Sequence, residues 1–412
     1  MTQKGLPMIS SDAVIIITSI LLLISFSFLA YIFIGYPAII FCLSKLFGKS
    51  VEKNILLPNV TLVIPAFNEE SVIKEKIINT LNLNYPKENL QIIVCDDFSN
   101  DQTKEIISSF AQEGVILSES TSRVGKIGGL NRALLLATGE IFVISDADTL
   151  ANPNTLQELV VNFSDKEVGC VIAQTRMLTA DNKSNESGGL YWKYESLIRQ
   201  SESHLHSTVA ATGHFMGIRT SILRPIPQDI ILDDFYLATE TMKQGLRVIS
   251  EPKATIWERP TTSMKDEVNR RRRMTAGRYQ ILFMWKKYLS KLPLLLKLQV
   301  ISHKFLRLAI PHFMILALIS NILLYIVFRS STPQTAIIAQ QVTIFTLFIQ
   351  MLFYFMAITG WYLSKKINKK SKLIKMWSIP YFLCATNFAS ILGLFWYLSG
   401  KRTVLWQQAS RH

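Results

Sequence analysis

Long apolar runs at both ends of the chain are the feature that most restricts its fold. They extend over about Ala13–Leu43, Phe305–Phe328, Ile337–Leu363 and Met376–Leu398. A helix crosses a bilayer with about 20 apolar residues, so each run is long enough for one span. Only Lys4 supplies positive charge before the first run, and no small-residue cleavage motif follows it. We therefore interpret this run as a retained anchor rather than a cleaved signal peptide.

The formal charge of +14 has two readings, a nucleic-acid-binding surface or basic loops on the cytoplasmic side of a membrane. Basic residues flank the apolar runs, so we favour the membrane and expect no nucleic-acid partner. Six lysines join the last two runs: Lys365, Lys366, Lys369, Lys370, Lys372 and Lys375. The positive-inside rule places this link in the cytoplasm and, counting back, the central domain as well. The same count puts the tail outside despite Lys401, Arg402 and Arg411, so the side of the tail stays open.

These runs predict five regions: an anchor at residues 1–50, a cytoplasmic domain at 51–278, interfacial helices at 279–304, three membrane helices at 305–400, and a tail at 401–412. Residues 279–304 mix basic with aromatic and aliphatic side chains, which is typical of helices lying among lipid headgroups. An ordinary helix on the domain surface is the alternative. We expect Pro293 to divide this region.

The central domain alternates short apolar runs with helical stretches. Strands are expected at about 60–65, 90–95, 115–117, 141–145 and 168–174, with helices between them. This order predicts an α/β fold: a doubly wound domain with a mostly parallel sheet, flanked by transmembrane helices. Ligands of such sheets bind beyond the carboxyl ends of the strands. Those ends carry Pro65–Asn68, Asp96–Asp97 and Asp146–Asp148.

Asp146 and Asp148 follow a strongly apolar strand. Two carboxylates two residues apart at a strand end can face one hard cation, and such a cation bridges phosphate oxygens. An aspartate-rich turn is the alternative, because a single such pair is common. We favour a metal site because other polar groups end the neighbouring strands.

Four more motifs carry candidate chemistry. Asp96-Asp97 can accept hydrogen bonds from a base or ribose, or cap a helix. Gly125–Gly129, with Lys126, is expected to be a flexible loop suited to an anion. Asp233-Asp234 opens a helical stretch, where a carboxylate can deprotonate an attacking hydroxyl or cap the helix. Arg270 and Arg273 share a helix face that suits a diphosphate or, alternatively, anionic lipid.

Taken in order, these motifs resemble the family 2 glycosyltransferases, specifically the membrane-integrated synthases of poly-N-acetylglucosamine, hyaluronan and cellulose type. The resemblance covers about residues 31–406. It rests on Val63–Glu69, Asp96-Asp97, Gly125-Lys126 with Leu130-Asn131, Asp146 with Asp148, Asp233-Asp234 and Arg270–Met274. It implies a GT-A fold.

The resemblance also implies roles for individual residues. The donor would be held by Pro65, Ala66, Phe67, Asn68, Glu69, Asp97, Lys126, Asp146, Arg270 and Arg273. Asp146 and Asp148 would bind Mg²⁺ or Mn²⁺, and Asp234 matches the acidic end of the family's TED motif, which makes it the expected catalytic base. Gly213, His214, Phe215 and Met216 resemble the segment that borders the acceptor.

Two departures from the family pattern bear on function. In the family's QxxRW motif, Arg270 replaces the glutamine and Met274 replaces the tryptophan, while Arg273 keeps the arginine. In processive synthases that tryptophan belongs to the acceptor site, so its replacement puts processivity in doubt. Phe98 replaces the usual glycine after the paired aspartates, which would narrow the nucleoside pocket.

The leading hypothesis is therefore an inverting transferase that uses a UDP-sugar, of UDP-GlcNAc or UDP-Glc type, to build a β-linked polysaccharide. The terminal helices, with or without an accessory export subunit, would form its path out of the cell membrane. A second hypothesis is a non-processive transferase acting on a lipid-linked or short glycan acceptor. A third, of another class, is a catalytically silent subunit of a polysaccharide exporter.

Overall fold

The computed structural model describes residues 11–177, 190–258, 264–330, 337–366 and 372–400. The tail after Gly400 lies outside the described residues. So do residues 367–371 of the six-lysine link, and the side chains of its other lysines are not described. The chain divides into two compact units. One comprises residues 1–36 and 305–395, and the other comprises residues 37–304 and 396–412.

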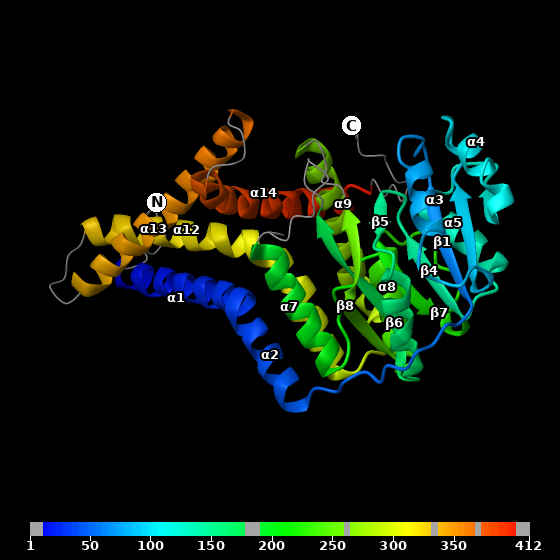
Figure 1. Ribbon diagram of the computed structural model, residues 1–412. Helices are drawn as coiled ribbons and strands as arrows, with labels where there is room; N and C mark the ends of the chain where they lie inside the picture. Colours follow the sequence, from blue (N-terminus) through cyan, green and yellow to red (C-terminus); the bar gives the residue numbers. More distant parts are fainter. Residues whose placement is uncertain (1–10, 178–189, 259–263, 331–336, 367–371, 401–412) are drawn as a thin grey trace, which may run out of the picture. The chain divides into compact units, whose positions relative to one another are not determined.

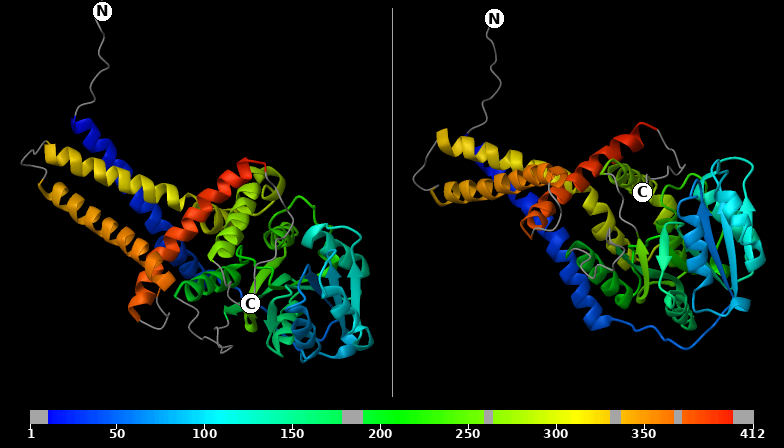
Figure 2. Two further views of the ribbon diagram at one scale, coloured as in Figure 1. Left: turned by 90° about the horizontal axis from the view of Figure 1, so that it is seen from above. Right: turned by 45° about the horizontal axis from the view of Figure 1, so that its top comes forward.

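The first unit consists of long apolar helices. α1 (Ser11–Ala30), α12 (Leu306–Ser330), α13 (Ile337–Lys366) and α14 (Lys372–Leu398) contribute to it. α12 lies alongside both α1 and α13 (Figure 2), and the rings of Phe28 and Phe313 stack 3.9 Å apart between their centroids. These helices match the apolar runs seen in the sequence.

Four described helices are long and apolar enough to cross a membrane: Ser11–Phe47, Leu294–Arg329, Ile337–Leu363 and Ile379–Leu398. The predicted break at Pro293 is confirmed, because Pro293 directly precedes α11 (Leu294–Val300). From α11 the helix continues through a π-helical turn (Ile301–Phe305) into α12. The apolar helix therefore starts at Leu294, before Phe305, the first residue of the apolar run identified in the sequence.

The second unit is built on an eight-stranded sheet (Figure 1). Its strands are β1 (Val60–Ala66), β2 (Leu90–Asp96), β3 (Val115–Glu119), β4 (Ile141–Ser145), β5 (Thr149–Ala151), β6 (Val168–Met177), β7 (Phe215–Arg219) and β8 (Arg247–Glu258). The order is β3-β2-β1-β4-β7-β6-β8-β5. The strands β3, β2, β1 and β4 run parallel, whereas β7 is antiparallel to both β4 and β6. The predicted α/β domain with a mostly parallel sheet and flanking membrane helices is confirmed, and the sheet also contains the antiparallel pairs β4–β7, β6–β7 and β5–β8.

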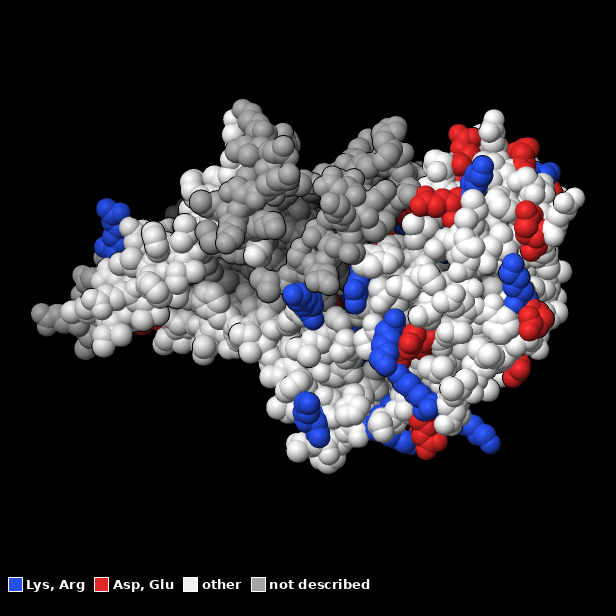
Figure 3. Space-filling model, viewed as in Figure 1, with Lys and Arg blue, Asp and Glu red and all other residues white. Residues whose placement is uncertain are grey.

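Helices cover this sheet and bury its apolar side chains. They are α3 (Ile73–Leu81), α4 (Thr103–Ser108), α5 (Gly125–Leu136), α6 (Thr155–Val160), α7 (Leu190–Leu205) and α8 (Asp233–Lys243). The unit also contains α9 (Met264–Phe283) and α10 (Trp285–Tyr288), and α2 (Tyr36–Phe47) leads into it. Leu62, Val143 and Ile77 are fully buried in the core between β1, β4 and α3. On the face shown in Figure 3, acidic and basic side chains are interspersed over this unit, while the apolar helices show few charges.

One local prediction was wrong. Gly125–Gly129 is not a flexible loop but the first turn of α5. Gly125 has φ +80°, a left-handed conformation that turns the chain into the helix and that glycine adopts without strain. A Cβ on Gly129 would lie 3.1 Å from the Cβ of Cys95, so glycine here lets α5 pack closely on β2.

Candidate active site

The predicted site residues gather where three parallel strands end. β1 pairs with both β2 and β4, and Ala66 at the end of β1 aligns with Asp96 at the end of β2. The Asp97 N–H donates to the Ala66 carbonyl at 2.9 Å, which joins the two loops that follow these strands. The parallel half of the sheet therefore brings the first two motifs together, as its topology requires.

The loop after β1 is held by the loop after β2. Asn68 adopts φ 54°, its N–H donates to the Ser99 hydroxyl at 2.9 Å, and its side-chain oxygen accepts from the Asn100 N–H at 3.0 Å. The buried Glu69 donates its N–H to the Thr103 hydroxyl at 2.8 Å. These bonds hold Phe67–Glu69 in a tight turn between β1 and α3, which begins at Ile73.

Asp97 connects this region to α5. Its two carboxylate oxygens accept the N–H groups of Val124 and Gly125 at 2.9 and 2.8 Å. The Arg123 guanidinium lies 3.9 Å from the same carboxylate and stacks 3.5 Å from the Phe67 ring centroid. Asp97 thus caps α5, while Asp96 accepts the N–H and hydroxyl of Ser99. Phe98, which directly follows Asp97, has φ 65° and is 56% exposed.

Lys126 joins parts of the site that are far apart in sequence. Its ammonium lies 2.9 Å from Asp146 Oδ1 and 3.1 Å from Asp233 Oδ2. Although burial favours the neutral amine, these carboxylates hold the pKa of Lys126 above its usual value. Burial likewise opposes ionisation of Asp146, but Lys126 and His214 keep the pKa of Asp146 low. The carboxylate that contacts Lys126 on α8 is Asp233, a residue to which the sequence assigned no role of its own.

Gly213 lies against the same group of side chains. A Cβ at this position would be 3.4 Å from the Lys126 ammonium and 3.4 Å from the Asp234 Cβ. The expected acceptor-side residue and the expected base are therefore neighbours of a donor-side lysine. Burial, followed by the nearby Asp233, raises the pKa of Asp234, although Lys126 opposes this. Asp234 Oδ1 also accepts the N–H of Phe235 at 2.7 Å.

A second group of charged side chains consists of His214, Glu258 and Arg270. Its Nδ1 lies 3.2 Å from Glu258 Oε2, and Glu258 Oε1 lies 3.5 Å from a guanidinium nitrogen of Arg270. Burial works against protonation of His214, but Glu258 raises the pKa of His214 to about 9. The His214 carbonyl accepts the Asp146 N–H at 3.2 Å. These charges therefore lie next to Asp146 and its partner Lys126. Sequence reasoning missed Glu258, whose only signal is an acidic residue ending the strand β8.

The remaining predicted residues are placed by their elements. Phe215 and Met216 are buried in β7, aligned with Ser145 and Ile144 of β4. Arg273 lies on α9 one turn after Arg270 and is partly exposed. The predicted helical spacing of these two arginines is confirmed.

Asp146 and Asp148 are the residues that would hold a divalent cation jointly with a substrate. Within the described part of the chain, no group of three or more acidic, histidine or cysteine side chains is arranged to hold a metal. From this loop Asp146 and Asp148 would supply two carboxylate ligands. Mg²⁺ is commonly held this way, by one or two carboxylates together with substrate phosphates and water.

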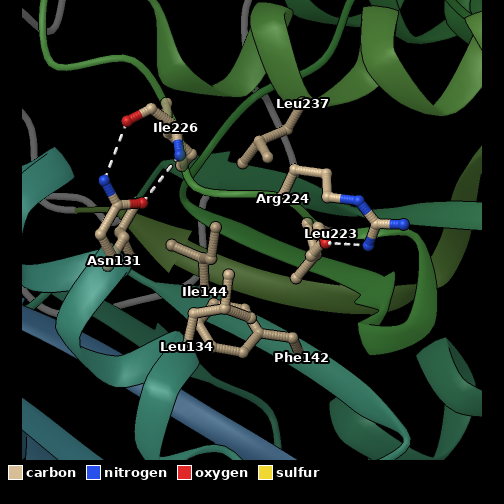
Figure 4. A pocket seen from close by; sticks show the side chains of 9 residues that line it. Asn131, Leu134, Phe142, Ile144, Leu223, Arg224, Ile226 and Leu237 are labelled. Carbon is tan, nitrogen blue, oxygen red and sulfur yellow. Dashed lines mark hydrogen bonds between the residues drawn. The ribbon is translucent and has the colours of Figure 1, made fainter.

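A small apolar pocket lies beside α5 (Figure 4). Leu134, Phe142 and Leu237 contribute to its lining. Asn131 points toward Ile226, donating to its carbonyl and accepting its N–H, both at 2.8 Å. Asn131 therefore fixes the segment that leads to α8 and its two aspartates.

Comparison with known proteins identifies the class. Residues 61–226 match the family described as Glycosyl transferase family 2, so the chain carries a family 2 glycosyltransferase domain. The matched range includes Asp97, Lys126, Asp146 and Gly213. Asp233, Asp234, Glu258 and Arg270 follow it in the chain.

Three similar proteins add detail. The beta-monoglucosyldiacylglycerol synthase of Nostoc sp. is 32% identical over 151 residues, 36% of this chain and 31% of that protein. The poly-beta-1,6-N-acetyl-D-glucosamine synthase of Staphylococcus aureus is 25% identical over 235 residues, 55% of this chain and 56% of that protein. The structure of a mannosyltransferase from Pyrobaculum calidifontis in complex with GDP-Man and Mn²⁺ has a TM-score of 0.67 and 24% identity, covering 92% of this chain and 99% of that one. The chain thus spans about a third to a half of the length of these two curated relatives, and the structural likeness shows the shared GT-A-like fold.

Proposed function

We propose that this protein transfers a sugar from a nucleotide-sugar to an acceptor hydroxyl, with inversion at the anomeric carbon. The observation that carries the proposal is the convergence of Lys126, Asp146, Gly213 and Asp234 at one place. A phosphate-binding cation, a carboxylate that would bind a metal, a glycine expected to border the acceptor and a half-buried carboxylate base are the groups that a direct displacement needs.

The reaction divides among these residues as follows. Asp234 takes the proton of the acceptor hydroxyl while the oxygen bonds to the anomeric carbon and the bond to the diphosphate breaks. The raised pKa of Asp234 makes it a stronger base than an exposed aspartate. Lys126, with Arg270 and Arg273, stabilises the negative charge of the departing diphosphate. A divalent cation on Asp146 and Asp148 would supply further neutralisation of that charge when bound.

For the donor we propose a UDP-sugar of UDP-GlcNAc or UDP-Glc type, bound along Pro65–Glu69 and Asp97. The poly-N-acetylglucosamine synthase relative supports this choice, and the mannosyltransferase neighbour, whose structure contains GDP-Man, makes GDP-sugars the comparison to include. Mn²⁺ in that neighbour supports a divalent cofactor, Mg²⁺ or Mn²⁺. We place the domain on the cytoplasmic side of the cell membrane, in contact with the bilayer.

The acceptor divides the proposal into two forms. A growing β-linked glycan would make the protein a polysaccharide synthase, with export through the membrane helices or an accessory subunit. A lipid acceptor would make it a single-addition transferase. The glycolipid synthase relative and Met274 in the tryptophan position favour the lipid acceptor.

The test uses the full chain in nanodiscs with Mn²⁺ or Mg²⁺ and a panel of UDP- and GDP-sugars. We expect Asp234→Asn to lower kcat by about 10²- to 10⁴-fold, the usual contribution of a general base, with donor binding retained. Asp146→Ala should abolish metal-dependent release of the nucleoside diphosphate. Long polymer identifies a synthase, and single additions to lipid identify the alternative. No turnover with any donor, and no change in Asp234→Asn, would support the silent subunit instead.

A further inference from the structure

A buried lysine lies beside the acidic pair and has no part in the proposed transfer. Lys76 on α3 is 1% exposed, whereas Lys74 on the same helix is exposed. Lysine is almost never fully buried unless it is paired, because removing an ammonium from water costs several kcal/mol. Its partners therefore indicate why the fold keeps it.

Both hydrogen bonds of the Lys76 ammonium go to the ends of the acidic segment. It donates to the Ser145 hydroxyl at 2.6 Å and to the Thr149 carbonyl at 2.6 Å. Ser145 is the last residue of β4 and Thr149 the first of β5, so only Asp146, Ala147 and Asp148 lie between them. One side chain thus ties together the two ends of the segment that presents both carboxylates.

The next turn of α3 holds the same segment further along. The Asn79 side chain donates to the Ala151 carbonyl at 2.9 Å and accepts the Ala151 N–H at 2.8 Å. Lys76 and Asn79 are three residues apart and therefore project from the same face of the helix. α3 is thus the support on which residues 145–151 are fixed.

The charges around Lys76 also connect it to Asp146 and Asp148. Burial lowers the pKa of Lys76 to about 8, and the carboxylates of Asp146 and Asp148 are the charges that oppose this. These two aspartates therefore compensate the buried ammonium. In return the ammonium reduces the repulsion between two carboxylates that must face one cation.

We propose that Lys76 is a positioning residue for the donor site. It holds Asp146 and Asp148 in the arrangement that binds a divalent cation together with the donor diphosphate, and it does so without touching the substrate. This inference rests on the proposed function, because it assumes that the two aspartates bind such a cation.

The test compares Lys76→Met, which keeps most of the unbranched side chain and removes its ammonium, with two control variants. Lys74→Met removes an exposed lysine from the same helix, and Ile77→Ala weakens the buried face of that helix next to Lys76. Binding of Mn²⁺ is measured by electron paramagnetic resonance on the full chain in nanodiscs, with UDP and, in parallel, GDP. Donor and acceptor KM values are measured alongside.

In Lys76→Met we expect a Mn²⁺ dissociation constant about 10- to 100-fold higher, the usual effect of losing a group that orients metal ligands. The donor KM should rise with it, while the acceptor KM stays unchanged. Lys74→Met should bind Mn²⁺ normally. Ile77→Ala should melt at a lower temperature yet bind Mn²⁺ normally, a result that separates positioning from stability.

A folded Lys76→Met protein whose Mn²⁺ affinity is within about twofold of the wild-type value would overturn the role of Lys76, since a lost orienting group costs more than that. If Lys76→Met does not fold, Lys76→Gln, which keeps a shorter hydrogen-bond donor, decides in the same way. A wild-type protein that neither binds Mn²⁺ nor turns over any donor refutes the proposed function itself. Wild-type turnover with unchanged Mn²⁺ binding in the variant refutes only the positioning role.

Discussion

The ion pair between His214 and Glu258 gives a prediction whose size follows from the structure. At 3.2 Å and an effective dielectric constant of about 20, two unit charges attract by about 5 kcal/mol. The rise in the pKa of His214 from 6.5 to about 9 corresponds to about 3 kcal/mol, which is smaller because burial opposes the charged ring. Asp146 and Asp148 supply part of this rise, so we expect a coupling of about 2 to 3 kcal/mol for the pair alone.

The coupling should depend on pH with a definite sign. The folded-state pKa of His214 is above its unfolded value, so its contribution is complete below about pH 6.5 and is lost as the pH rises through about 9. Burial opposes ionisation of Glu258, but His214 holds the pKa of Glu258 below 4.5. At the acid end, therefore, the contribution is lost only as the pH falls through that lowered value.

A double-mutant cycle with Glu258→Gln and His214→Gln measures this coupling. Urea unfolding of the full chain in detergent micelles, followed by tryptophan fluorescence, gives the free energies, with EDTA present because a cation near Asp146 would disturb the titration of His214. The exposed pair Lys49 and Glu167 is the control, for which a cycle should give less than about 1 kcal/mol. A His214–Glu258 coupling below about 0.5 kcal/mol near pH 6, or one equally large near pH 10, would refute the reasoning.

Two further substitutions test the packing of the second unit. His303 is 1% exposed, and its Nδ1 lies 2.7 Å from Glu202 and its Nε2 3.2 Å from Glu195. His303→Leu should therefore destabilise the protein by about 3 to 5 kcal/mol, because it leaves two buried carboxylates without this partner. The effect is measured as a lower melting temperature, and an unchanged melting temperature would contradict the prediction. A Cβ on Gly139 would lie 2.4 Å from the backbone nitrogen of Thr61, so Gly139→Ala should cost about 1 to 3 kcal/mol in urea unfolding, and a neutral result would show that β1 can shift there.

Much of the fold could be predicted because it depends on local patterns. Apolar runs of bilayer length predicted the membrane helices, and alternating strands and helices predicted the α/β domain. The positions of Pro65–Asn68, Asp97 and Asp146 followed from one rule, that parallel strands bring their carboxyl ends to one edge. The glycines of Gly125–Gly129 misled because a glycine-rich turn and the start of a helix look alike until φ of Gly125 is known.

Only the tertiary structure decided which charges meet. Lys126 contacts Asp233, and Glu258 contacts His214 and Arg270, across long stretches of sequence. Lys76 lies in a helix whose sequence gives no sign that its ammonium reaches Ser145 and Thr149. The sequence by itself determined the class of fold and the residue types at the strand ends, because both are set by short-range periodicity. The pairing of buried charges depends on packing between distant elements, which no local pattern records.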